Sequence, residues 1–145
     1  MTINHLAPRT GGNAANIAGF ARAGPRARLP GCTGAVREAM GPEGRIRVDA
    51  NGAWNVDEAE HAIHALAEFD LEYAEQPCAS VEELAELRRR VKYMGIPIAA
   101  DESVRKAADP VAVARAGAAD LLVIKAQPLG GVRRLLLQRQ AELLQ

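Results

Sequence analysis

Four short runs decide the fold: RIRVD (45–49), LEYAE (71–75), IPIAAD (96–101) and LLVIK (121–125). Each run is five or six residues long and β-prone, which is typical of short buried strands. The last residues of successive runs lie 26, 26 and 24 residues apart. From residue 45 onward, the chain therefore repeats one strand-containing unit.

Helix signals fill the first two intervals between these runs. Asp57, with Glu60 three residues later, is typical of a capping box, and Ser80 with Glu83 repeats the pattern. Each pair is followed by apolar residues at helical spacing. We therefore expect one helix after each of the first two strands.

Two further helices are expected after the third and fourth strands. Asp109 precedes Pro110 at a helix start, and Gly117 can close that helix. A last helix is expected after Gly130-Gly131, with apolar positions at Val132, Leu135, Leu136 and Leu143. Strand and helix thus alternate four times.

This alternation predicts an α/β fold. Strands joined by helices pair in parallel through right-handed crossovers. The spacing is close to that of a (β/α)8 barrel, in which one unit takes about 30 residues. We predict about four parallel βα units of a partial TIM-type barrel, with an open doubly wound parallel sheet as the alternative.

Each of the four runs ends on a charged residue: Asp49, Glu75, Asp101 and Lys125. The carboxyl ends of parallel barrel strands form one rim, where active sites lie. Strand alternation places Ile46 and Val48 toward the helices and Asp49 toward the barrel mouth. One acid at a strand end commonly just begins a loop, but three in register, followed by a lysine, favour a functional site.

Three carboxylates in a small space repel one another unless a cation lies among them. A hard divalent cation with oxygen ligands satisfies this requirement, and Mg²⁺ keeps open positions for water or substrate. Such an ion can hold a substrate carboxylate while the adjacent carbon loses a proton. Lys125 could act as acid, base or charge stabiliser. We therefore expect Mg²⁺ as cofactor and a small-molecule carboxylate as substrate.

Composition excludes several other classes of protein. The 145 residues contain 18 basic and 18 acidic residues, so no net field favours nucleic acid or a membrane surface. Hydrophobic residues make up 48% and aromatic residues 3%, which predicts an aliphatic core. No run approaches the about 18 apolar residues of a membrane span. Cys32 and Cys78 lie far apart, as expected for reduced thiols in the cytoplasm.

The beginning of the chain differs from the rest. Residues 1–34 are rich in Arg, Gly and Ala, and no acidic residue precedes Glu38. This stretch shows no clear apolar periodicity, so we expect a poorly ordered leader. Residues 35–145 are then expected to form the partial barrel domain.

Four motifs resemble the enolase superfamily, in its muconate-cycloisomerase subgroup: VDANGAW (48–54), EQP (75–77), ADES (100–103) and IKAQPLGG (124–131). Within it, the likeness is greatest to the actinobacterial o-succinylbenzoate synthase family of menaquinone biosynthesis. The resemblance covers about residues 35–134. The motifs occur in the order and spacing of the family, which makes the resemblance specific.

The resemblance implies a role for each strand-end residue. Asp49, Glu75 and Asp101 match the Mg²⁺ ligands on barrel strands three, four and five. Lys125 matches the sixth-strand catalytic lysine, which stabilises charge in this activity. The remaining matches beside the ligands, which could orient them, are Asn51 and Ser103.

The implied reaction is a Mg²⁺-dependent dehydration by a carbon–oxygen lyase. It removes a proton alpha to a carboxylate, passes through an enediolate and loses water, giving o-succinylbenzoate. An N-acylamino-acid racemase or dipeptide epimerase of the same superfamily is the near alternative. A non-catalytic metal-binding remnant is the alternative of another class.

The sequence departs from the family at one motif. The family carries a Lys-x-Lys pair on its second strand, whereas no lysine precedes Asp49 here. We expect the chain to be a central fragment of the enzyme, without the capping domain or strands seven and eight. Exposed barrel edges would then favour self-association.

Overall fold

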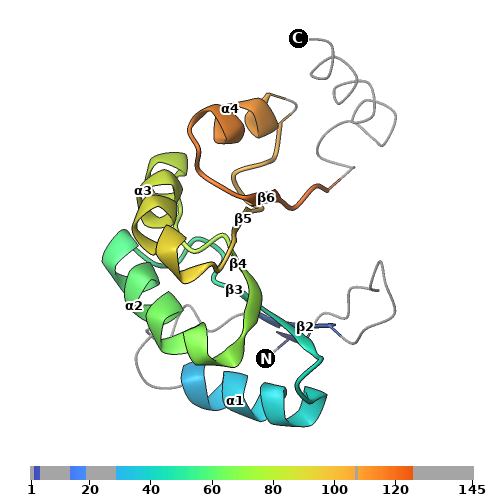
Figure 1. Ribbon diagram of the computed structural model, residues 1–145. Helices are drawn as coiled ribbons and strands as arrows, with labels where there is room; N and C mark the ends of the chain where they lie inside the picture. Colours follow the sequence, from blue (N-terminus) through green and yellow to red (C-terminus); the bar gives the residue numbers. More distant parts are fainter. Residues whose placement is uncertain (1, 4–13, 19–28, 107, 126–145) are drawn as a thin grey trace.

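The computed structural model describes residues 2–3, 14–18, 29–106 and 108–125 (Figure 1). The strands are β1 (Thr2–Ile3), β2 (Ala14–Ala18), β3 (Arg45–Asp49), β4 (Leu71–Glu75), β5 (Ile98–Ala100) and β6 (Leu121–Leu122). The helices are α1 (Leu29–Met40), α2 (Val56–Leu66), α3 (Val81–Val91) and α4 (Asp109–Arg115). Short 3-10 turns, η2 (Ala67–Phe69) and η3 (Lys92–Met94), extend α2 and α3.

The strands form one sheet in the order β1-β2-β3-β4-β5-β6. Strands β2 to β6 pair in parallel, and β1 pairs with β2 in the antiparallel sense. Helices α1, α2 and α3 lie along one side of the sheet (Figure 1). A doubly wound sheet carries helices on both faces, so this layout agrees with part of a barrel. The predicted parallel α/β fold is confirmed.

All four predicted strands are present. Strands β3 and β4 have the predicted bounds, whereas β5 and β6 are shorter than their runs. The β5–β6 pairing consists of Ala99 with Leu121 and Ala100 with Leu122. Among the described helices, none is long and apolar enough to cross a membrane. The expected last helix, with Val132, Leu135, Leu136 and Leu143, lies outside the described residues.

Strands β1 and β2 and helix α1 were not predicted from sequence. The β2 sequence AANIA lacks a β-branched run, yet it pairs along its length with β3, from Ala14 opposite Arg45 to Ala18 opposite Asp49. Ala14, Ala15 and Ile17 are buried. Pairing with a neighbouring strand therefore sets this element more than local propensity does. The proposed domain boundary after residue 34 stays a prediction, and α1 runs across it.

The start of α2 corrects the predicted cap. Asn55 caps this helix, and its side chain accepts a hydrogen bond from Glu58 N at 2.9 Å while Glu58 accepts from Asn55 N at 3.1 Å. The predicted pair Asp57 and Glu60 lies inside the helix, where both acids form ion pairs with Arg90. Asn55 has the extended backbone that a cap requires.

The other two helix starts differ from each other. Ser80 and Glu83 form the predicted capping box of α3. Asp109 is instead the first residue of α4, and its carboxylate accepts hydrogen bonds from Arg105 N and Lys106 N. Asp109 thus fixes the loop before the helix. The predicted stop at Gly117 is confirmed, with a left-handed φ of 61°.

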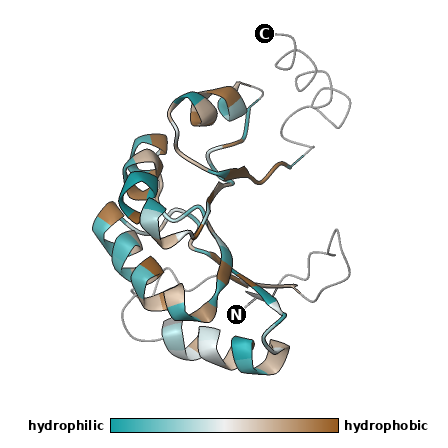
Figure 2. Cartoon of the chain, viewed as in Figure 1, coloured by the Kyte–Doolittle hydropathy of each residue, from teal (hydrophilic) through white to brown (hydrophobic). Residues whose placement is uncertain are grey.

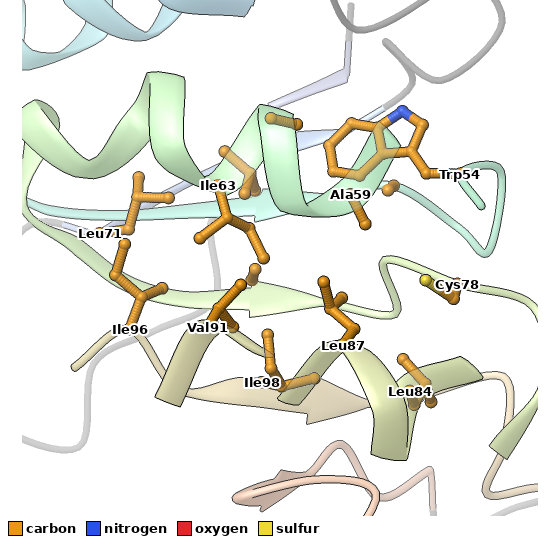
Figure 3. Packing of buried hydrophobic residues seen from close by; sticks show 14 of the residues in the cluster. Trp54, Ala59, Ile63, Leu71, Cys78, Leu84, Leu87, Val91, Ile96 and Ile98 are labelled. Carbon is orange, nitrogen blue, oxygen red and sulfur yellow. The ribbon is translucent and has the colours of Figure 1, made fainter. Parts of the chain in front are cut away.

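The core lies between the sheet and these helices. Ile46 and Val48 are buried and belong to one apolar cluster with the helical side chains, as predicted. Figure 3 shows Ile63 of α2 and Leu87 and Val91 of α3 facing the strands. The cluster of buried residues is aliphatic apart from Cys78 and Trp54, of which Trp54 is 4% exposed.

Two charged side chains hold the amino-terminal edge of the sheet. Arg37 of α1 donates to the carbonyls of Phe69 and Asp70, just before β4, and to that of Gly44, just before β3. Asp120 accepts from Ile98 N at 3.0 Å, at the start of β5. These contacts lie at the opposite edge from the candidate site.

Candidate metal site

The predicted site residues lie at the carboxyl ends of neighbouring strands. Asp49 and Glu75 are the last residues of β3 and β4 and are directly paired in register. Asp101 follows the last residue of β5, and Lys125 lies three residues beyond β6. Because the strands are parallel, these residues share one edge of the sheet.

Asp49 is held by Asn51. The Asn51 backbone N–H donates to one Asp49 carboxylate oxygen at 2.9 Å, and its side-chain amide donates to the other at 3.0 Å. The same amide donates to Glu102 at 3.2 Å, which links the loops after β3 and β5. Asn51 has a φ of 51°, a left-handed conformation that asparagine tolerates better than most residues. The predicted contact between Asn51 and a strand-end acid is therefore present.

Glu75 is buried in the middle of the group, with 5% of its surface exposed. Burial raises the pKa of Glu75 to about 7, and the negative charges of Asp49 and Asp101 add to the increase, while Lys125 opposes it. Burial also raises the pKa of Asp49, an effect opposed by the hydrogen bond from Asn51 N and reinforced by the charge of Glu102. The carboxylates therefore lie close enough to repel one another.

Asp101 is paired with Lys125. The Lys125 Nζ donates to Asp101 Oδ2 at 2.5 Å. The hydrogen bond from Lys125 to Asp101 raises the pKa of the lysine, an effect that partial burial opposes. Both residues line an open pocket with Glu102, Val104 and Arg105. The structure thus brings the lysine to the acids, as the strand-end pattern predicts.

Two residues of this edge were not singled out from the sequence. Glu102 contacts Asn51, and its second carboxylate oxygen is buried without a hydrogen-bond partner among the described residues. Gln76 is fully buried and donates to Ser103 Oγ at 2.8 Å. Gln76 lies within the motif EQP and Glu102 within ADES, each directly after a predicted ligand, and this position was the available signal.

The donor set fits a hard divalent cation in its chemistry. Asp49, Glu75 and Asp101 offer oxygen atoms only, which suits Mg²⁺. Burial and the neighbouring charges of Asp49 and Asp101 both raise the pKa of Glu75, and a cation among these carboxylates would offset the charge repulsion. In their present spacing, no three Asp, Glu, His or Cys side chains among the described residues come together closely enough to hold a metal ion. Their roles as ligands therefore stay predictions.

The chain belongs to the enolase C-terminal domain-like family, whose model matches residues 21–141. An o-succinylbenzoate synthase from Thermobifida fusca (strain YX) is 63% identical over 99 residues. Those residues are 68% of this chain and 30% of that protein, so the chain spans less than a third of this relative. The resemblance predicted from the four motifs is confirmed.

Solved structures give the same fold. A dipeptide epimerase from Enterococcus faecalis V583 has a TM-score of 0.78 and 32% identity, covering 88% of this chain and 36% of that chain. A racemase from Streptomyces coelicolor A3(2), solved with bound magnesium, has a TM-score of 0.74 and 28% identity. It covers 90% of this chain and 36% of that chain. Mg²⁺ is thus bound by a solved relative that shares this fold.

Strand β2 lies beside β3, where the family resemblance implies the strand with the Lys-x-Lys pair. Its five residues, AANIA, contain no lysine. In register, position 18 lies opposite Asp49 and position 16 lies opposite Arg47. The Lys-x-Lys pair of the family is therefore missing from the strand next to the candidate site, as the sequence predicts.

Proposed function

We propose that this chain provides the Mg²⁺-binding part of an o-succinylbenzoate synthase-like lyase. The observation that carries the proposal is the 63% identity with the Thermobifida fusca synthase. The register of Asp49 with Glu75 and the pairing of Lys125 with Asp101 support it. In the proposed reaction a proton alpha to a carboxylate is removed first, giving an enediolate, and the hydroxyl group of the neighbouring carbon then leaves, so that the net loss is one water molecule.

Each side chain has a proposed role in this reaction. Asp49, Glu75 and Asp101 would hold Mg²⁺, which supplies positive charge for the substrate carboxylate as the proton leaves. Lys125 presents its ammonium group on the same edge and would stabilise developing negative charge. Asn51 would orient Asp49 through its two hydrogen bonds. Ser103 would act further away, through its contact with Gln76.

The proposal is tested by Mg²⁺ titration in a calorimeter. The wild-type chain should bind one Mg²⁺ weakly, and Asp101→Asn or Asp49→Asn should abolish the heat of binding. Asp57→Asn is the matched control, because it removes an exposed carboxylate that lies on α2 instead of at the strand ends. Equal binding by the wild type and Asp101→Asn would refute the assignment.

The two alternative functions are an epimerase and a non-catalytic metal-binding chain. The 32% identity and TM-score of 0.78 with the Enterococcus faecalis dipeptide epimerase favour an epimerase as second candidate. Assays for dipeptide epimerisation and for o-succinylbenzoate formation, run on the same Mg²⁺-loaded sample, separate the two. A metal-binding chain that supports neither reaction would match the non-catalytic alternative.

We also propose the substrate class, the partners and the cellular location of the chain. We propose a small-molecule carboxylate as substrate, no nucleic-acid or membrane partner, and self-association of the chain. A cytoplasmic location is proposed from the cysteine usage, since Cys32 and Cys78 are both free thiols.

A further inference from the structure

Gln76 occupies an unusual place at the centre of the strand ends. It directly follows Glu75, is fully buried and has a φ of 37°, a left-handed conformation that side-chain-bearing residues seldom adopt. Backbone strain of this kind persists only where the surroundings impose it, and it gathers at functional sites. The contacts of Gln76 therefore require an explanation.

The backbone of Gln76 joins three strands. Its N–H donates to Ala99 O of β5 at 2.7 Å, and its carbonyl accepts from Gly52 N, in the loop after β3, at 2.7 Å. Gln76 thus links the segments that follow Asp49 and precede Asp101.

The side-chain amide of Gln76 is fully used. Its oxygen accepts from Asp101 N at 2.8 Å and from Ser103 N at 3.2 Å. Its nitrogen donates to Cys78 O at 2.9 Å and to Ser103 Oγ at 2.8 Å. A carboxamide offers two donors and two acceptor lone pairs, so this set leaves none spare. The bonds to Asp101 N and Cys78 O are buried, where a low dielectric constant strengthens them and makes the network more rigid.

These contacts fix the relation between two of the proposed ligands. Glu75 is covalently joined to Gln76, and Asp101 is held by its backbone N–H. Moving the Gln76 amide would shift Asp101 relative to Glu75, and it would free the loop that carries Glu102 and Ser103. Metal sites depend on such outer contacts, whose loss typically lowers metal affinity about 10- to 100-fold.

We propose that Gln76 is a positioning residue that sets the Mg²⁺ affinity of this edge by fixing Asp101 against Glu75. The inference rests on the proposed function, because it assumes that these carboxylates hold Mg²⁺. Gln76 makes no proposed bond to the metal and would act only through its contacts with the loop after β5.

The test compares Mg²⁺ affinity with unfolding stability. Gln76→Met keeps the length of the side chain and removes its four hydrogen bonds, and it should weaken Mg²⁺ binding at least tenfold. Gln76→Asn keeps the amide but shortens the side chain by one methylene, and it should give an intermediate loss. If Gln76→Met does not fold, the Mg²⁺ affinity of Gln76→Asn tests the inference.

Arg37→Met is the matched control. Arg37 also bonds several backbone carbonyls, but at the amino-terminal edge of the sheet. This variant should lower the midpoint of urea unfolding while its Mg²⁺ affinity stays within about twofold of the wild type, because its contacts lie away from the proposed ligands. A metal-free readout is amide exchange, in which Asp101 N–H should exchange faster in both Gln76 variants and at the wild-type rate in Arg37→Met.

The outcomes separate this inference from the proposed function. A wild-type chain that binds no Mg²⁺ would overturn the proposed function and this inference with it. Wild-type binding that both Gln76 variants retain unchanged would overturn the inference alone. An equal loss of affinity in Arg37→Met would also overturn it, since the effect would then follow general stability.

Discussion

The carboxylate of Asp120 shows how one side chain can stabilise this sheet. It accepts from Ile98 N at 3.0 Å and from Arg88 Nε at 2.8 Å. Burial acts to raise the pKa of Asp120, but the hydrogen bonds from Arg88 and Ile98 outweigh it and leave that pKa below its ordinary value. Because the pKa is depressed in the folded state, the ionised form contributes stability at neutral pH. That contribution is lost as the pH falls through the folded-state pKa.

Asp120→Asn should therefore lower the free energy of unfolding by about 1 kcal/mol at pH 7. The difference from the wild type should shrink as the pH falls below about 4, the usual range of an aspartate in unfolded chains. Urea unfolding at a series of pH values measures both effects. Asp57→Asn, which changes an exposed partner of Arg90, should cost less than about 0.5 kcal/mol. A difference that grows at low pH would contradict the assignment.

Among single residues, the sequence predicted the location of those site residues that recur at a regular spacing. Asp49, Glu75, Asp101 and Lys125 were predicted to share one edge because parallel strands repeat at a regular interval. Gln76 and Glu102 were not predicted, because their contacts depend on loop paths. The left-handed φ of Gln76 has no strong local signature in the sequence, whereas the Asn51-Gly52 pair is a typical turn signal that does not specify the contacts of the loop.

Among the elements, strand β2 has the greatest functional consequence. It pairs positions 16 and 18 with Arg47 and Asp49 of β3, yet residues 1–91 contain no lysine. A positioned general acid or base typically contributes about 10² to 10⁴ in rate. We therefore expect little o-succinylbenzoate formation by the wild-type chain with Mg²⁺.

The double variant Asn16→Lys/Ala18→Lys should raise this turnover by about 10²-fold, the lower end of that range. The matched control is Asn16→Arg/Ala18→Arg, which adds the same charge without an amine that titrates in proteins. An equal gain in both would indicate a charge effect instead of proton transfer. Robust wild-type turnover that Lys125→Ala abolishes would contradict the prediction and make Lys125 the sole acid/base.

The helix starts and strand β2 show where local sequence signals suffice to predict an element and where they do not. The Ser80 and Glu83 box was predicted correctly because serine offers the only capping side chain immediately before that helix. In α2, Asn55 and Asp57 both suit a cap, and the extended backbone at Asn55 decides between them. Strand β2 was missed because its alanines carry little strand propensity, and pairing with β3 compensates for it.

Over the whole molecule, apolar surface gathers near strand β6. Leu121, Leu122 and Ile124 are 43%, 36% and 42% exposed, whereas β4 and β5 are largely buried. Figure 2 shows β6 as a hydrophobic segment. The exposure of Leu122 and Ile124 differs from the burial of Ile46 and Val48 on β3. An exposed apolar strand favours pairing with another chain.

We therefore predict that the chain self-associates at micromolar concentration through β6. Light scattering should give a mass above that of a monomer of 15.4 kDa. Leu121→Lys/Leu122→Lys should shift the mass toward the monomer, because a charged edge strand resists pairing. Tyr93→Lys is the matched control, since Tyr93 is 73% exposed but lies in η3, away from β6. A compact wild-type monomer would contradict the prediction, and an equal shift with Tyr93→Lys would show that added charge, not the β6 edge, controls association.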